Sequence, residues 1–78
     1  MILAVNQMLL IFKTNINTQE KVNTISSLLN KNPLIIDWSV DLLDVDYVLR
    51  IEANNGLTEE EVKHRLLQEG YWLEPLDS

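Results

Sequence analysis

Two helix-start signals, each following an apolar run of strand length, divide this chain of 78 residues into two similar halves. In the first half Asn17 is followed three residues later by Glu20, and in the second half Thr58 is followed by Glu61. This pattern is typical of a capping box, in which the two side chains satisfy backbone N–H groups that the first helical turn leaves unpaired. Each half is therefore expected to contain one helix.

Apolar residues on either side of these signals predict four strands and two helices. The strands are expected at about residues 7–14, 34–42, 47–53 and 71–76. The buried helix faces are expected to be Val22, Ile25, Leu28 and Leu29 in the first helix, and Val62, Leu66 and Leu67 in the second. Pro33 ends the first helical region because proline cannot continue a helix, and Gly70 ends the second because glycine adopts a left-handed conformation freely.

The order strand, helix, strand, strand, helix, strand predicts a single α+β domain over residues 1–78. We expect a ferredoxin-like βαββαβ sandwich, with two helices on one face of a four-stranded antiparallel sheet of strand order 4-1-3-2. Residues 1–7 are interpreted either as an early start of the first strand or as an N-terminal extension. They lack the charged region and small-residue cleavage site of a signal peptide.

Charge and cysteine content exclude several classes of function. The net charge is −6, and no basic stripe is present, so nucleic acid and anionic membrane surfaces are not expected partners. The chain has no cysteine, which is compatible with a reducing compartment, and we expect it in the cytoplasm. A chain this short has little stability to spare, so oligomerisation is one way of supplementing its core.

Four short segments over residues 8–76 resemble the heavy-metal-associated, copper-chaperone-like domains, especially the short bacterial ones. They are Phe12-Lys13-Thr14-Asn15-Ile16, Trp38-x-Val40-Asp41-Leu42, Val48-Leu49 and Gly70-Tyr71. In that family a C-x-x-C motif lies between the first strand and the first helix, and the aligned positions here are Thr18 and Lys21. A hydroxyl is a hard neutral ligand and an ammonium has no free lone pair, so neither replaces a thiolate for copper(I). We therefore expect a degenerate metal site and no cofactor.

Other candidate ligands and catalytic groups are isolated in the sequence. Asp41, Asp44 and Asp46 lack the spacing and the glycine of a calcium loop, and are interpreted as turn residues. His64 is expected on the exposed face of the second helix, with no convergent partners for catalysis. No glycine-rich loop follows the first strand to cradle a phosphate, so we expect no enzymatic activity. A residual metal role through Met8, His64 or carboxylates stays open as an alternative.

The strand pattern predicts an interaction surface. Alternation directs Leu10, Phe12, Trp38, Val40, Leu49 and Ile51 towards the helices. It places Leu9, Ile11, Val48 and Trp72 on the opposite face of the sheet, rimmed by Arg50, Glu52 and Glu74. An apolar cluster with a polar rim indicates a protein partner or a homodimer. Two other readings are that these are ordinary scattered surface residues, and that residues 1–5 fold back over them.

The resulting hypothesis is a non-enzymatic domain that resembles a metal carrier, lacks the metal-binding thiols, and acts through protein contact or self-association. The alternatives are residual heavy-metal binding through ligands other than cysteine, and a small-molecule sensor, for which the sequence offers no motif.

Overall fold

The computed structural model describes residues 7–76. It contains six elements: β1 (Gln7–Thr14), α1 (Gln19–Leu29), β2 (Ile35–Asp41), β3 (Val48–Asn54), α2 (Glu59–Gln68) and β4 (Leu73–Pro75). The predicted order of strands and helices is confirmed, although β4 is shorter than the expected strand at 71–76. Gln7 belongs to β1, so it is not part of an extension. The interpretations placed on residues 1–6 lie outside the described residues.

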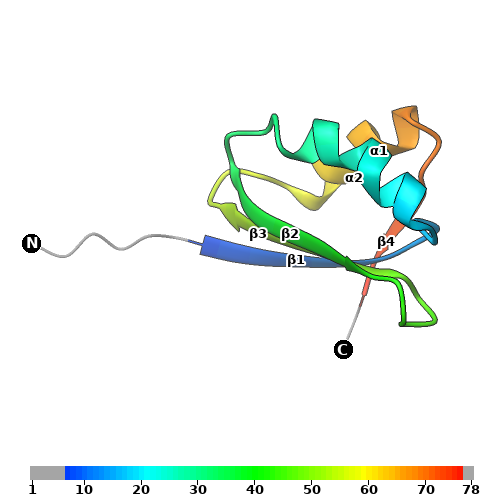
Figure 1. Ribbon diagram of the computed structural model, residues 1–78. Coiled ribbons are helices and arrows are strands. Elements are labelled where there is room, and N and C mark those ends of the chain that lie inside the picture. The colour runs from blue at the N-terminus through cyan, green and yellow to red at the C-terminus, as the bar shows by residue number, and fades with distance from the viewer. Residues whose placement is uncertain (1–6, 77–78) are drawn as a thin grey trace, which may run out of the picture.

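The four strands form one antiparallel sheet of order β2-β3-β1-β4, which is the predicted order written from the opposite edge. Both helices lie over the same face of this sheet (Figure 1). The described part of the chain is therefore an α+β fold with two layers. Among residues 7–76, no helix is both long enough and apolar enough to cross a membrane.

The core lies between the sheet and the helices, as strand alternation predicts. Phe12 is fully buried in β1, opposite Leu49 of β3 and Pro75 of β4. The buried core cluster consists of Leu10, Phe12, Ile16, Ile25, Leu29, Leu49, Ile51, Ala53, Leu57, Val62, Leu66 and Leu73. Trp38 and Val40 of β2 are partly buried and pack against it, as does Met8, which gives Met8 a packing role.

Helix α1 begins one residue later than predicted. Its N-cap is Thr18, which has an extended backbone and whose Oγ1 accepts a hydrogen bond from the backbone N–H of Lys21 at 3.1 Å. Asn17 instead accepts a hydrogen bond from the Lys21 side chain, at 2.7 Å between Oδ1 and Nζ. The capping box expected from Asn17 and Glu20 is therefore wrong. Asn and Thr are both good N-caps, so two adjacent candidates cannot be separated from local sequence alone.

Helix α2 has the predicted start but a narrower buried face. The N-cap is Thr58, whose Oγ1 accepts from the Glu61 N–H at 3.2 Å and whose hydroxyl also lies 3.2 Å from Glu61 Oε1. Val62 and Leu66 are buried, but Leu67 is 64% exposed, so its predicted burial is wrong. Val62 and Leu66 are four residues apart and lie on one helical stripe, whereas Leu67 is turned a further 100° around the axis.

The C-terminus of α2 closes with Gly70, as predicted. Gly70 has φ of 90°, its N–H donates to the Leu67 carbonyl at 2.9 Å, and the Tyr71 N–H donates to the Leu66 carbonyl at 2.9 Å. These two bonds form a Schellman motif, which satisfies carbonyls that the last helical turn leaves unpaired. Tyr71 also packs against the core, so the motif fixes where the chain turns back towards β4.

Gly70→Ala should lower the free energy of unfolding by about 1 kcal/mol, because a Cβ is unfavourable in the left-handed region. Apart from Gly70 itself and its two neighbours in the chain, no atom of the described residues lies within 4 Å of the position that this Cβ would occupy, so the cost is conformational rather than steric. Urea unfolding, monitored by circular dichroism, measures this loss of unfolding free energy. Gly70→Asn is the control and should lose less, because asparagine tolerates this conformation. Equal losses for the two variants would contradict the assignment.

Candidate functional site at the loop end of the sheet

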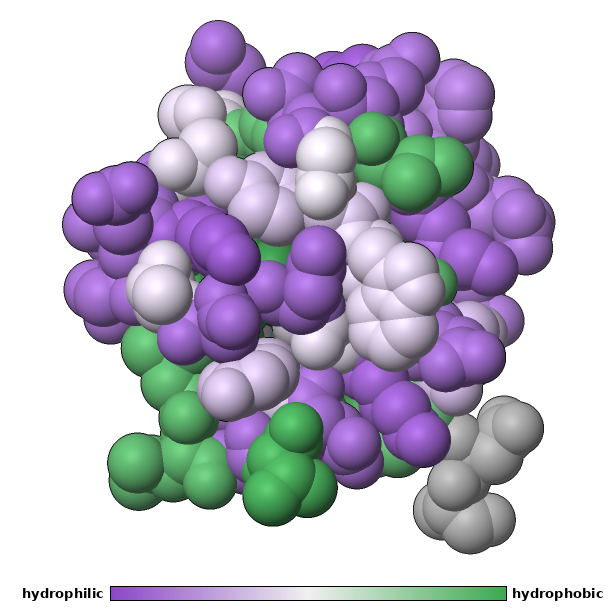
Figure 2. Space-filling model, turned by 90° about the vertical axis from the view of Figure 1, so that its right-hand side faces the viewer, coloured by the Kyte–Doolittle hydropathy of each residue, from purple (hydrophilic) through white to green (hydrophobic). Residues whose placement is uncertain are grey.

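Three connecting segments meet at one end of the sheet: the β1–α1 loop at 15–18, the β2–β3 turn at 42–47, and residues 71–72 before β4. They surround an open hollow of about 430 Å³, which we call the loop-end hollow. It is lined by Lys13, Thr14, Asn15, Asn17, Val45, Asp46, Tyr47 and Trp72. Figure 2 looks at this end of the molecule. Asn17, which lines the hollow, directly precedes Thr18 in the β1–α1 loop.

Thr14 joins two of these segments. It is the last residue of β1 and is 5% exposed. Its hydroxyl donates to the Tyr47 carbonyl at 2.7 Å, and its Oγ1 accepts from the Ile16 N–H at 3.0 Å. Its backbone N–H donates to the Asp46 carbonyl at 3.0 Å. A single buried side chain thus holds the β2–β3 turn against the start of the β1–α1 loop.

Asn15, in the β1–α1 loop, connects residues 71–72 to the other two segments. Its Oδ1 accepts a hydrogen bond from the Trp72 backbone N–H at 2.9 Å, across 57 positions in the chain. The Trp72 side chain is 49% exposed and lines the loop-end hollow together with Val45. Trp72 precedes β4, which begins at Leu73, so it lies at the end of the sheet and outside any strand.

The aspartates of the β2–β3 turn support its backbone. Asp41 Oδ1 accepts from the Leu43 N–H at 3.0 Å, and Asp44 Oδ1 accepts from the Asp46 N–H at 2.8 Å. The Asp44 carbonyl accepts from the Tyr47 N–H at 3.1 Å. Such bonds from an aspartate to the backbone two residues on are Asx turns, in agreement with the interpretation of these residues as turn formers. Among residues 7–76, no group of three or more His, Cys, Asp or Glu side chains is placed to hold a metal ion.

Tyr47 ends the turn in an unusual conformation. Its φ is 46°, the only positive value for a non-glycine residue among those described. This region costs a non-glycine residue about 1 kcal/mol or more and persists where surrounding contacts impose it. Two hydrogen bonds impose it here: the Thr14 hydroxyl donates to the Tyr47 carbonyl, and the Tyr47 N–H donates to the Asp44 carbonyl. The turn therefore has one strongly constrained conformation.

Two aliphatic side chains project from this constrained turn into solvent. Leu43 is 98% exposed and Val45 is 89% exposed, the two largest values among the exposed large hydrophobic residues that the structure describes. Hydrophobic surface gathers along the lower edge of the view in Figure 2, where the β2–β3 turn projects. The sequence prediction missed these residues because it treated 43–46 only as a connection. The signal was the alternation of aliphatic and acidic residues in Leu43-Asp44-Val45-Asp46.

The structure places the four residues of the predicted interaction face differently from one another. Leu9 is 55% exposed, and Ile11 is half-buried. Val48 is only 2% exposed, so the expectation that it forms part of an exposed patch is wrong. It is the first residue of a central strand, directly after the turn, with β2 and β1 on its two sides. Trp72 contributes to the loop-end hollow rather than to the face with Leu9.

Thr18 and Lys21 both act in the start of α1. Thr18 is the N-cap and Lys21 lies in the first turn, where its ammonium donates to Asn17 Oδ1. Both side chains therefore have roles in local helix structure. His64 is exposed on α2, with its Nε2 at 3.3 Å from Gln68 Nε2, in agreement with its interpretation as a surface residue.

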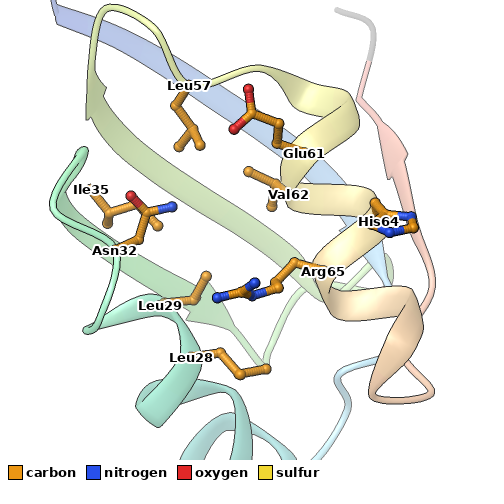
Figure 3. A pocket seen from close by; sticks show the side chains of 9 residues that line it. All are labelled: Leu28, Leu29, Asn32, Ile35, Leu57, Glu61, Val62, His64 and Arg65. Carbon is orange, nitrogen blue, oxygen red and sulfur yellow. The ribbon is translucent and has the colours of Figure 1, made fainter.

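A second hollow, of about 280 Å³, lies between α1 and α2. Its lining is shown in Figure 3 and consists of Leu28, Leu29, Asn32, Ile35, Leu57, Glu61, Val62, His64 and Arg65. Asn32 Oδ1 already accepts from the Leu34 N–H at 2.9 Å, and Glu61 takes part in the cap of α2. His64 points away from the other lining side chains (Figure 3). Arg65 extends its guanidinium into the groove (Figure 3), so the groove combines apolar surface with one cationic side chain.

A comparison of the chain with protein-family models, curated proteins and solved structures finds no match.

Proposed function

We propose that this chain is a non-enzymatic protein-interaction domain of ferredoxin-like fold that docks its β2–β3 turn onto another protein. The observation that carries the proposal is the nearly complete exposure of Leu43 and Val45 on a turn with a constrained backbone. Their burial in a complex offers about 1.5–3 kcal/mol for each residue.

Preorganisation of the turn favours binding. Ordering a flexible loop on binding costs conformational entropy, and a loop that is already ordered avoids much of that cost. The Asx turns at Asp41 and Asp44 and the Thr14–Tyr47 hydrogen bond supply this order. The exposed apolar side chains are thus presented in one arrangement, as is typical of a binding loop on a rigid scaffold.

The partner is expected to present an apolar pocket with a basic rim. Three aspartates, Asp41, Asp44 and Asp46, lie among the apolar residues of the turn, and the whole chain carries a net charge of −6. Lysine or arginine around the pocket would complement this charge and speed association at low ionic strength. Val45 and Trp72 both line the loop-end hollow, so the contact extends from the turn towards Trp72.

The resemblance to heavy-metal-associated domains is in keeping with this proposal. It implies a carrier-like scaffold, while Thr18 and Lys21 stand at the positions of the metal-binding thiols and serve the start of α1. We propose that such a domain uses the same end of the molecule for protein contact without metal. The absence of cysteine from the sequence fits a cytoplasmic location.

The double variant Leu43→Ser/Val45→Ser tests the proposed docking. Both side chains are exposed, so the variant should keep wild-type stability within about 0.5 kcal/mol. The immobilised wild-type chain should capture a protein from a lysate of its source cells. The double variant should lose that protein, and rising salt should weaken its binding to the wild-type chain.

Leu67→Ser is the matched control, because Leu67 is also exposed but lies on α2. It should capture the same protein as the wild type. Capture that the double variant retains, or the absence of any protein captured by the wild type, would contradict docking through the turn.

A further inference from the structure

Strand β1 has an open hydrogen-bonding edge over its first half. β1 runs over eight residues, but β4 pairs only with residues Phe12, Lys13 and Thr14. The Leu76 N–H donates to the Ile11 carbonyl at 2.9 Å, which is the last backbone hydrogen bond on that side within residues 7–76. Within residues 7–76, no strand lies beside Gln7–Leu10 on the β4 side, and Figure 1 shows β1 extending well beyond β4.

The backbone groups that face this open edge can be identified. In an antiparallel strand the N–H and C=O of one residue point to the same side, and successive residues alternate. The Ile11 carbonyl accepts from Leu76, so Ile11 faces β4, whereas the Thr14 N–H donates to Asp46 on the β3 side. By alternation Leu9 and Gln7 face the open edge, and Met8 and Leu10 face β3. The open edge therefore presents the N–H and C=O of Gln7 and Leu9.

The other two sheet edges carry features that discourage pairing with another strand. β2 has exposed aspartates, Asp37 and Asp41, and an irregularity in register between Ile35 and Asp37. β4 has only three residues and ends in Pro75. Charged residues, bulges, proline and short length are the usual means of protecting a sheet edge. Gln7–Leu10 has none of them, and its register with β3 is regular.

We propose that the open edge of β1 binds the same edge of a second copy of this chain, in an antiparallel pair about a two-fold axis. Two identical antiparallel strands satisfy each other's N–H and C=O groups, as a symmetric dimer requires. The pair joins two four-stranded sheets into one continuous sheet. Leu9, which is 55% exposed, lies close to its copy across the axis and adds apolar contact.

The distribution of charge indicates where two copies of this acidic chain can approach each other. Each chain carries a net charge of −6, so two copies repel at most surfaces. Residues 1–12 contain no charged side chain, and the first in the sequence is Lys13. Within the open stretch itself, Gln7, Met8, Leu9 and Leu10 are all uncharged. At this edge two acidic chains can therefore meet without placing like charges against each other.

This interface is separate from the docking turn. Gln7 pairs with Asn54, at the end of β3 remote from the β2–β3 turn, so both surfaces are free to act together. The inference does not depend on the proposed function. Leu43→Ser/Val45→Ser should remain dimeric, which separates a failure of one proposal from a failure of the other.

Sedimentation equilibrium and native mass spectrometry of the full chain test the dimer. The wild type should show a dimer whose fraction rises with concentration. Leu9→Lys should shift the protein to monomer, because it places two ammonium groups close together across the axis. Leu9→Pro should do the same, because it removes an N–H that faces the open edge and leaves the β3 ladder intact. Leu67→Lys, an exposed change elsewhere, should remain dimeric.

Cross-linking gives a second measurement that does not depend on loss of association. The chain has no cysteine, so Leu9→Cys and Leu67→Cys each carry a single thiol. Under mild oxidation Leu9→Cys should form a disulfide dimer at least ten times faster than Leu67→Cys. A wild type that is monomeric at every concentration would overturn the proposal, as would equal cross-linking rates.

Discussion

Leu66→Ala should lower the free energy of unfolding by about 3–5 kcal/mol, whereas Leu67→Ala, one residue later, should change it by less than about 0.5 kcal/mol. Both residues are leucines of α2, but their surroundings differ. Leu66 is fully buried in the core cluster and Leu67 is 64% exposed. Truncation of Leu66 loses apolar burial and leaves a cavity between α2 and the sheet, while truncation of Leu67 leaves no cavity.

The predicted loss is large relative to the total stability of so small a domain. At about 0.05–0.15 kcal/mol per residue, a chain of 78 residues has roughly 4–12 kcal/mol. Leu66→Ala should therefore be partly unfolded or unfold at a much lower temperature. Thermal and urea unfolding by far-ultraviolet circular dichroism measures both variants, and similar losses for the two would contradict the placement of α2 on the sheet.

Thr14→Val should lower the free energy of unfolding by about 2–4 kcal/mol, although valine has nearly the same shape. The change removes the donor to the Tyr47 carbonyl and the acceptor for the Ile16 N–H. A buried polar group that loses its partner costs about 1–3 kcal/mol. In the described residues, no buried side-chain nitrogen or oxygen lacks a hydrogen-bond partner, so this site is fully satisfied before the change.

The effect of Thr14→Val should also be local to the turn. Amide hydrogen exchange at Asp46, Tyr47 and Ile16 should accelerate more than exchange in α2. Thr14→Ser keeps the hydroxyl and should retain the protection of the turn. Thr24→Val removes a hydroxyl that donates to the Glu20 carbonyl on the exposed face of α1, and should cost less than about 0.5 kcal/mol. A loss at Thr14 no larger than at Thr24 would show that the turn has other sufficient support.

Local signals were sufficient for the order of the elements and for several of their ends. Thr58 with Glu61 marked the start of α2 and Gly70 marked its end, because caps depend on residues within one helical turn. Alternation in β1 predicted burial of Leu10 and Phe12, since the period of a strand assigns its side chains to two faces. The strand order followed from the sequence of elements and was confirmed by the sheet.

The candidate site was harder to predict because its parts are distant in sequence. The loop-end hollow depends on a bond from Asn15 to Trp72 and on contacts from Thr14 to the β2–β3 turn, across 33 positions or more. No local pattern indicates which residues such a fold brings together. The choice of Thr18 over Asn17 as the cap, and the exposure of Leu67, likewise depended on how the helices are placed on the sheet.

By itself, the sequence of this protein determined the types and order of its strands and helices, the absence of thiol ligands, and the acidic charge. These follow from residue chemistry and from spacing within a few positions. Only the tertiary structure decided that Val48 is buried, that Leu43 and Val45 are exposed on a constrained turn, and that no strand within residues 7–76 pairs with the first half of β1 on the β4 side. Burial and edge pairing are properties of neighbours in space, and those neighbours are set by packing across the whole chain.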